Sequence, residues 1–135
     1  MRAAELNATE RILLVDDEPM VLHALQRQLR NEFLIHIAEG PEAGLKALQE
    51  DGPFAVVVSD MRMPRMSGVQ FLDQVRQHWP ETVRMMLTGN SDQSTAIDAV
   101  NRGQIYRFLN KPCPNEILRL ALDSALAQYR SMRIE

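Results

Sequence analysis

The sequence of 135 residues contains a single cysteine, Cys113. A lone cysteine cannot form a disulfide within the chain or a multi-cysteine metal site, so nothing in the sequence indicates an oxidising compartment. The longest apolar run, residues 54–58, is far below the roughly 20 residues that span a bilayer. Residues 1–10 also lack the apolar core of a signal peptide. We therefore expect a cytoplasmic protein with no membrane segment.

An excess of basic charge is absent as well, because 15 lysines and arginines face 18 aspartates and glutamates, for a formal net charge of -3. Proteins that follow a nucleic-acid backbone need a basic surface. We therefore expect this domain to bind no nucleic acid by itself, although a separate output module could do so. Hydrophobic residues make up 45% and charged residues 24%, the balance of an ordinary globular protein. The length fits one domain with a single core.

The pattern that is present alternates short aliphatic runs with amphipathic stretches of helical period, which is typical of βαβ units around a parallel sheet. Strands are expected at residues 11–15, 33–38, 54–59, 83–87 and 105–109. Helices are expected from about 17 to 30, 41 to 49, 68 to 80, 92 to 102 and from 115 onward. The run from residue 54 is apolar at nearly every position, which places it at the centre of the sheet, covered on both faces.

Local signals indicate how these helices begin and end. Asp17-Glu18-Pro19 predicts a helix start with an acidic cap and a proline in the first turn. Gly103 is typical of a left-handed helix end. The last helix has an apolar band wider than core packing requires and no glycine or proline stop, so we expect part of it to meet a partner and the chain to lead into an output domain. Residues 1–10 are expected to be a flexible lead-in.

Four strands end in residues suited to handling a phosphate. Asp16 and Asp17 follow the first strand, Asp60 the third, Thr88 the fourth and Lys111 the fifth. Ligands of open parallel sheets bind where the carboxyl ends of the strands meet, so these side chains should converge. Carboxylates brought close together repel one another, and a divalent cation offsets this repulsion. Oxygen ligands without histidine or cysteine favour Mg²⁺, or Mn²⁺, over zinc.

With a metal in place, one carboxylate can act as a nucleophile on phosphorus. Asp60 is the best-placed candidate, because it stands alone on the central strand while Asp16 and Asp17 can hold the ion. Lys111 and Thr88 would then contact two of the phosphoryl oxygens. Each residue alone also has a structural explanation, such as helix capping by Asp17. Their joint occurrence at the strand ends favours phosphoryl transfer.

The segments that carry these residues closely resemble the receiver (response regulator) domain of bacterial two-component signalling. They are residues 13–18, 59–68, 86–89 and 108–112, and the likeness covers about residues 11–130, giving a receiver domain over 11–131. The resemblance implies a flavodoxin-like, doubly wound (βα)5 sheet of order 2-1-3-4-5, with Asp60 phosphorylated by a sensor histidine kinase. It also implies a cis peptide before Pro112 and a metal site formed by Asp16, Asp17, Asp60 and the backbone carbonyl of Arg62.

By the same resemblance Thr88 is the switch hydroxyl, drawn toward the phosphoryl group once that group forms. Phe108 is the aromatic residue expected to turn into the space that Thr88 leaves, with Tyr106 as the alternative; core packing is the structural explanation for either aromatic. Arg62 and Asn90 are expected to tune the lifetime of the phosphorylated state, because both could reach the attacking water or the phosphoryl oxygens.

The surface of the fourth helix, the fifth strand and the last helix, including Ala96, Ile97 and Val100, is expected to contact an output module or a second copy of the chain. The stretch from Arg107 to Pro112 is weakly similar to receivers attached to HD-type cyclic-dinucleotide phosphodiesterases or hybrid kinases, more than to those of DNA-binding regulators. We expect a signalling domain without enzymatic turnover.

Two other readings stay open. A haloacid-dehalogenase-like phosphohydrolase also uses an aspartyl nucleophile after a parallel strand, but here Pro19 occupies a loop that would need freedom, and no cap domain is present. A binding module could keep the fold and work without phosphate. The presence of every required side chain argues against this second reading.

Overall fold

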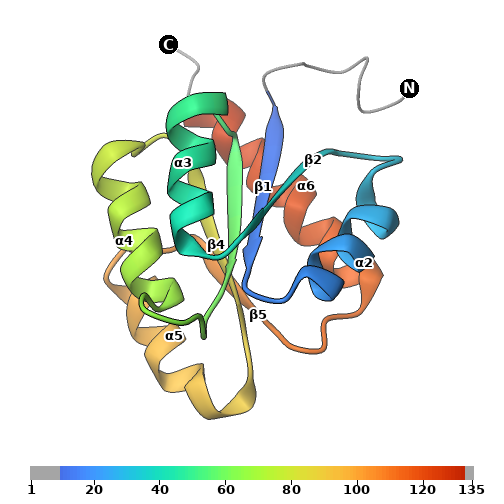
Figure 1. Ribbon diagram of the computed structural model, residues 1–135. Coiled ribbons are helices and arrows are strands. Elements are labelled where there is room, and N and C mark those ends of the chain that lie inside the picture. Colours follow the sequence, from blue (N-terminus) through green and yellow to red (C-terminus); the bar gives the residue numbers. More distant parts are fainter. Residues whose placement is uncertain (1–9, 133–135) are drawn as a thin grey trace.

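The computed structural model describes residues 10–132, apart from the side chain of Asn90, and shows helices on both sides of a central sheet (Figure 1). The expected lead-in therefore lies almost entirely outside the described residues. The elements are β1 (Arg11–Asp16), α2 (Pro19–Leu29), β2 (Leu34–Glu39), α3 (Pro41–Asp51), β3 (Val56–Asp60), α4 (Gly68–His78), β4 (Val83–Thr88), η1 (Asn90–Asp92), α5 (Gln93–Asn101), β5 (Arg107–Asn110) and α6 (Asn115–Met132).

The five strands are all parallel and lie in the order β2-β1-β3-β4-β5. This confirms the expected flavodoxin-like topology. Strand β3 is buried at every position, as its continuous apolar run predicted. The central place of β3 puts its last residue, Asp60, in the middle of the carboxyl edge of the sheet.

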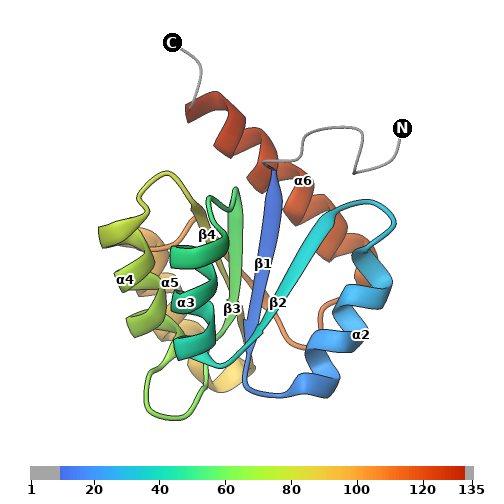
Figure 2. The ribbon, with the colours of Figure 1, turned by 45° about the horizontal axis from the view of Figure 1, so that its top comes forward.

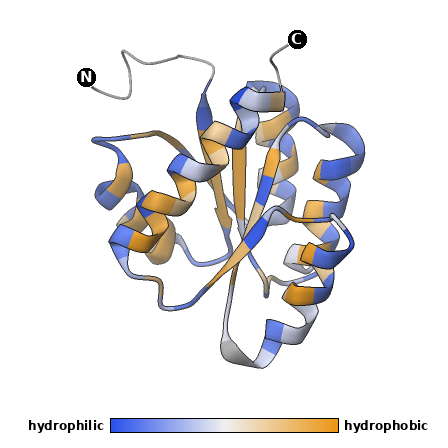
Figure 3. Ribbon diagram, turned by 180° about the vertical axis from the view of Figure 1, so that it is seen from behind, coloured by the Kyte–Doolittle hydropathy of each residue, from blue (hydrophilic) through white to orange (hydrophobic). Residues whose placement is uncertain are grey.

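Helices α2 and α6 cover one face of the sheet, and α3, α4 and α5 cover the other (Figures 1 and 2). Successive strand residues point to opposite faces, so Ile12 and Leu14 pack with α2 and α6 while Leu13 and Val15 pack on the other side. The strands between the two helix layers are mostly hydrophobic (Figure 3). Two apolar layers thus stabilise the sheet, and the polar residues of interest lie at the carboxyl ends of the strands.

The start of α2 differs from the expected acidic cap. Glu18 precedes the helix but makes no side-chain cap hydrogen bond. Its backbone N–H instead donates to Oδ1 of Asp16, at 2.9 Å, so the carboxylate that meets this turn comes from the end of β1. The other end signal was correct: Gly103 follows α5 with a φ of 73°, in the left-handed region that favours glycine.

Helix α6 buries one side and leaves apolar residues on the other, as its wide apolar band predicted. Ile117 and Leu120 are 46% and 62% exposed. On α5, Ile97 is 49% exposed, but Ala96 is fully buried and Val100 packs against the core. The expectation that Ala96 belongs to the outer surface was therefore wrong, because the helical rotation that turns Ile97 outward turns Ala96 inward, whereas Val100 stays partly exposed.

The residue before β1 and the last turns of α6 meet at the amino edge of the sheet. Arg130 in the last turns of α6 donates to both carboxylate oxygens of Glu10, at 2.6 and 2.5 Å. Helix α6 therefore ends at the edge of the sheet opposite to Asp60 (Figure 2). None of the helices in the described part of the chain is long and apolar enough to cross a membrane.

Candidate functional site

The structure brings together residues from the carboxyl ends of three strands. Lys111, which follows β5, donates from Nζ to Oδ1 of Asp60 at 2.7 Å. The same Nζ lies 3.8 Å from Oδ2 of Asp16, the last residue of β1. These side chains are far apart in the sequence and meet because parallel strands present their carboxyl ends at one edge.

Asp60 and Lys111 form the centre of this site. Asp60 is only 7% exposed and Lys111 is half-buried. Burial lowers the pKa of Lys111, but the hydrogen bond and charge of Asp60, together with the charges of Asp16 and Glu18, raise it above its ordinary value overall. The lysine therefore stays positively charged at neutral pH and faces a carboxylate that is largely shielded from water.

Asp16 is a buried carboxylate with incomplete hydrogen bonding. It is 2% exposed, and its Oδ2 has no hydrogen-bond partner among the described residues. Burial, opposed by the N–H of Glu18 and reinforced by the nearby charge of Asp60, raises the pKa of Asp16 to about 6. A buried carboxylate oxygen without a donor is costly, and a cation placed beside it would remove that cost.

The acidic residues at this edge offer oxygen ligands for such a cation. Asp16, Asp17 and Glu18 each have a carboxylate oxygen, and these atoms lie within 4.8 Å of one another. Carboxylate oxygens at this spacing suit Mg²⁺ as ligands, and one of these residues, Asp16, has a buried oxygen without a hydrogen-bond partner among the described residues. Glu18 was not among the metal ligands expected from the sequence, and the expected ligand Asp60 is not part of this cluster.

The Asp16→Asn variant should be more stable than the parent when EDTA keeps both metal-free. The amide removes a buried charge, and raising a carboxyl pKa from 3.8 to about 6 corresponds to on the order of 1 to 3 kcal/mol of unfolding free energy. The folded parent holds its proton more tightly than the unfolded chain, so the advantage of the variant grows as the pH rises from 3.8 to about 6 and stays constant above.

Urea unfolding in EDTA at pH 5 and pH 7.5 measures this difference. Asp73→Asn is the control, because Asp73 bonds to Arg76 at the surface and its pKa is lowered by that hydrogen bond. That variant should be slightly less stable than the parent. An Asp16→Asn variant that is also less stable in EDTA would contradict the prediction.

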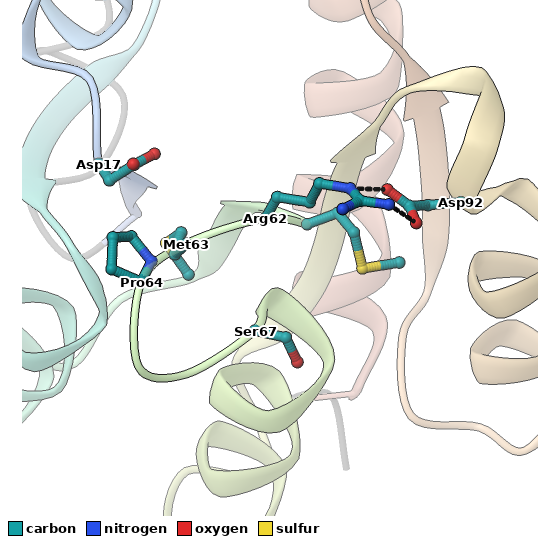
Figure 4. A pocket seen from close by; sticks show the side chains of 7 residues that line it. Asp17, Arg62, Met63, Pro64, Ser67 and Asp92 are labelled. Atoms are coloured by element: carbon teal, nitrogen blue, oxygen red, sulfur yellow. Dashed lines mark hydrogen bonds and ion pairs between the residues drawn. The ribbon is translucent and has the colours of Figure 1, made fainter.

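Two adjoining hollows open above these residues. One, of about 370 Å³, is lined by Asp17, Glu18, Asp60, Met61, Arg62, Gly89, Ser91, Asp92 and Lys111. The other, of about 520 Å³, is lined by Asp17, Met61, Arg62, Met63, Pro64, Ser67 and Asp92 (Figure 4). Arg62 and Asp92 border both hollows and form an ion pair that no sequence pattern had indicated. The first hollow has room for a phosphoryl group and hydrated ligands beside Asp60.

The expected switch residues lie on β4 and β5, and Thr88 directly precedes Gly89, which lines the first hollow. Thr88 is fully buried, and its Oγ1 donates to the carbonyl of Gly89 at 3.2 Å. Strand alternation places Thr88 on the same face of the sheet as Phe108, which packs half-buried against the α5 side. Tyr106 instead has its hydroxyl 2.8 Å from Oγ of Ser124 on α6. Phe108 is therefore the better placed of the two aromatic candidates.

Two remaining expectations concern the loops. The peptide before Pro112 is cis, as the resemblance implied, and a second cis peptide that the sequence had not indicated precedes Pro53. Asn90 begins η1, but its side chain lies outside the described residues, so its tuning role stays a prediction. The side chain of Arg62 does border the hollow that contains Asp60.

Comparison with known proteins places this geometry in a family. The model of the response regulator receiver domain matches residues 12–123. The hydrogenase transcriptional regulatory protein HoxA of Cupriavidus necator is 36% identical over 119 residues, which make up 87% of this chain and 24% of that protein. A solved structure described as adenylate cyclase from Rhodopirellula baltica has a TM-score of 0.89 and 41% identity, covering 92% of each chain.

The signal receiver domain of an HD domain-containing protein from Pseudomonas fluorescens Pf-5 has a TM-score of 0.83 and 35% identity, covering 90% of this chain and 98% of that chain. The present chain spans about a quarter of the length of HoxA and of most of the other curated relatives that it matches. The family match covers most of the sequence and agrees with the strand order. The chain belongs to the response regulator receiver domain family, a family of signalling domains in bacterial two-component systems.

Proposed function

We propose that this chain is a phosphoacceptor domain in which Asp60 receives a phosphoryl group from a sensor histidine kinase or a small phosphodonor, in the presence of Mg²⁺. The observation that carries this proposal is the 2.7 Å bond between the ammonium of Lys111 and the shielded carboxylate of Asp60. A carboxylate next to the ammonium of Lys111, and beside an acidic cluster that would hold Mg²⁺, can accept a phosphoryl group whose negative charge these two cations would neutralise.

In the proposed transfer, a carboxylate oxygen of Asp60 attacks phosphorus, the new oxygen–phosphorus bond forms, and the phosphorus–nitrogen bond to the kinase histidine breaks. The imidazole leaves and takes a proton from solvent. Asp16 and Asp17, with Asp60 and the carbonyl of Arg62, would hold the Mg²⁺, which when bound neutralises charge on the transferring group. Lys111 bonds to the phosphoryl oxygens, and the hydroxyl of Thr88 turns toward them.

Phosphorylation would then change the outer surface of α5, β5 and α6, which a partner would recognise. Ile97, Tyr106, Ile117 and Leu120 are apolar or aromatic residues exposed there. We propose that this surface contacts an output domain, a downstream protein or a second copy of the chain, in the cytoplasm where the kinase delivers phosphate. The named relatives include a transcriptional regulator and a receiver from an HD domain-containing protein, so either kind of output is compatible with the domain.

Incubation of the chain with acetyl phosphate tests the proposal. One phosphoryl group per chain should appear by intact-mass spectrometry when Mg²⁺ is present, and replacing Mg²⁺ with EDTA should reduce labelling at least tenfold. If no label appears, and if beryllofluoride and Mg²⁺ leave the NMR spectrum of the chain unchanged, the phosphate-independent binding module would be favoured. Continuous release of phosphate from a phosphomonoester would favour the phosphohydrolase.

A further inference from the structure

Arg62 and Asp92 form a two-bond ion pair at the mouth of the hollow above Asp60. We propose that Asp92 is a positioning residue that holds the Arg62 guanidinium at the rim of this hollow and thereby sets how long a phosphoryl group on Asp60 survives attack by water. This inference rests on the proposed function of Asp60. It assigns a role to Asp92, at the start of α5, that no motif in the sequence had indicated.

Two hydrogen bonds join the Arg62 guanidinium to the Asp92 carboxylate. Nε of Arg62 donates to Oδ2 of Asp92 at 2.7 Å, and a terminal nitrogen donates to Oδ1 at 2.9 Å. The Arg62 side chain is 74% exposed, whereas that of Asp92 is 17% exposed. The carboxylate is therefore the anchored partner and the arginine is the partner that can move. Two parallel hydrogen bonds of this kind add both strength and directional specificity to an arginine–carboxylate pair.

Asp92 occupies the N-cap position of α5 but makes no side-chain cap hydrogen bond. Aspartate is among the preferred capping residues, and a cap contributes about 0.5 to 2 kcal/mol to a helix. Here the carboxylate is turned to Arg62 instead (Figure 4). The Asp92 carboxylate thus pairs with Arg62 instead of capping α5.

If the Arg62 guanidinium left Asp92, a phosphoryl group on Asp60 would be another anion within its reach. Arg62 comes two residues after Asp60, and both line the hollow that also contains Lys111. A phosphoryl group on Asp60 carries about −1.5 to −2 charges at neutral pH, by analogy with other phosphorylated side chains. Asp92 and the phosphoryl group therefore compete for the same guanidinium.

The loop between β3 and α4 has a second arginine–carboxylate pair, which lies outside the hollow that contains Asp60. Arg65, with a φ of 69°, donates to both carboxylate oxygens of Glu42 on α3, at 2.9 and 3.1 Å. Neither Arg65 nor Glu42 lines the hollow that contains Asp60. The pair of Arg65 with Glu42 anchors the loop without offering a cation to the phosphoryl group, so it provides a matched control.

In dephosphorylation, water attacks phosphorus, the bond between phosphorus and the Asp60 oxygen breaks, and the carboxylate is regenerated as inorganic phosphate leaves with the protons of the water. A guanidinium lying over the phosphoryl oxygens excludes water from this approach. Loss of the pairing with Asp92 should place Arg62 there more often and slow the reaction. Loss of Arg62 should open the approach and speed it.

The test uses the full chain, labelled with acetyl phosphate and Mg²⁺ and then freed of donor, with loss of the label followed over time. Asp92→Asn should lose the label at least threefold more slowly than the parent, and Arg62→Ala more than twofold faster. The Arg62→Ala/Asp92→Asn double variant should match Arg62→Ala within twofold, because Asp92 acts only through Arg62. Glu42→Gln should stay within twofold of the parent.

Asp98→Asn, which breaks the exposed pair of Asp98 with Arg102 on the same helix, controls for the loss of one negative charge and should also match the parent. A slow Asp92→Asn variant whose effect persists without Arg62, or is reproduced by Glu42→Gln, would show a general effect of loop or helix anchoring and overturn the inference. So would an Asp92→Asn rate within twofold of the parent. A parent chain that takes no label would instead contradict the proposed function of Asp60.

Discussion

The Asp60→Asn variant should take up no phosphoryl group from acetyl phosphate or from a cognate kinase. The amide matches the carboxylate in shape and can still accept the hydrogen bond of Lys111, now 2.7 Å from Oδ1, so the fold and the pocket should remain. An uncharged amide, however, is a poor nucleophile toward phosphorus. We expect labelling to fall by a factor of at least about 100, which corresponds to about 2.7 kcal/mol of activation free energy.

Intact-mass spectrometry of both proteins after incubation with acetyl phosphate and Mg²⁺ measures this loss. The label on the parent should be lost in base, as expected of an acyl phosphate. Asp98→Asn is the matched control, since Asp98 is an exposed carboxylate on α5 paired only with Arg102 among the interactions seen. A label on Asp60→Asn at more than a tenth of the parent level would mean that another residue accepts the phosphoryl group.

The Gly68→Ala variant should lose about 3 kcal/mol of unfolding free energy, or fail to fold, because it overpacks a site that cannot relax. A Cβ on Gly68 would lie 2.3 Å from the backbone carbonyl oxygen of Asp60 and 2.9 Å from Cα of Met61. The N–H of Gly68 also donates to the carbonyl of Met61 at 2.7 Å. Ser67 and Gln70 form a capping box around the same turn. Neither the helix nor the strand can move away cheaply.

Urea unfolding of Gly68→Ala beside Gly89→Ala measures this effect. A Cβ on Gly89 would meet no atom within 4 Å, so that variant should stay within about 0.5 kcal/mol of the parent. Gly68 packs on the carbonyl of the acceptor residue itself, and any Gly68→Ala protein that folds should therefore also be labelled more slowly. A Gly68→Ala variant as stable as the parent would show that the close approach is not rigid.

Much of the site was predictable because its residues follow directly from the strand pattern. Periodic apolar runs identified five strands, and the parallel arrangement of those strands required Asp16, Asp60, Thr88 and Lys111 to meet at one edge. This argument needs only the end of each strand and the sheet type. It does not depend on the shape of any loop, which is why it succeeded from the sequence.

The pattern of residues by itself therefore determined the parallel βαβ arrangement and the edge at which the acidic, hydroxyl and amino groups gather, because short apolar runs and helical period distinguish strands from helices. The strand order followed from the resemblance to receiver domains. Only the tertiary structure decided that Asp92 pairs with Arg62, that the N–H of Glu18 donates to one carboxylate oxygen of Asp16, and that Ala96 points inward. Such contacts depend on loop paths and on the rotation of each helix about its axis, which local patterns leave undetermined until the layers pack.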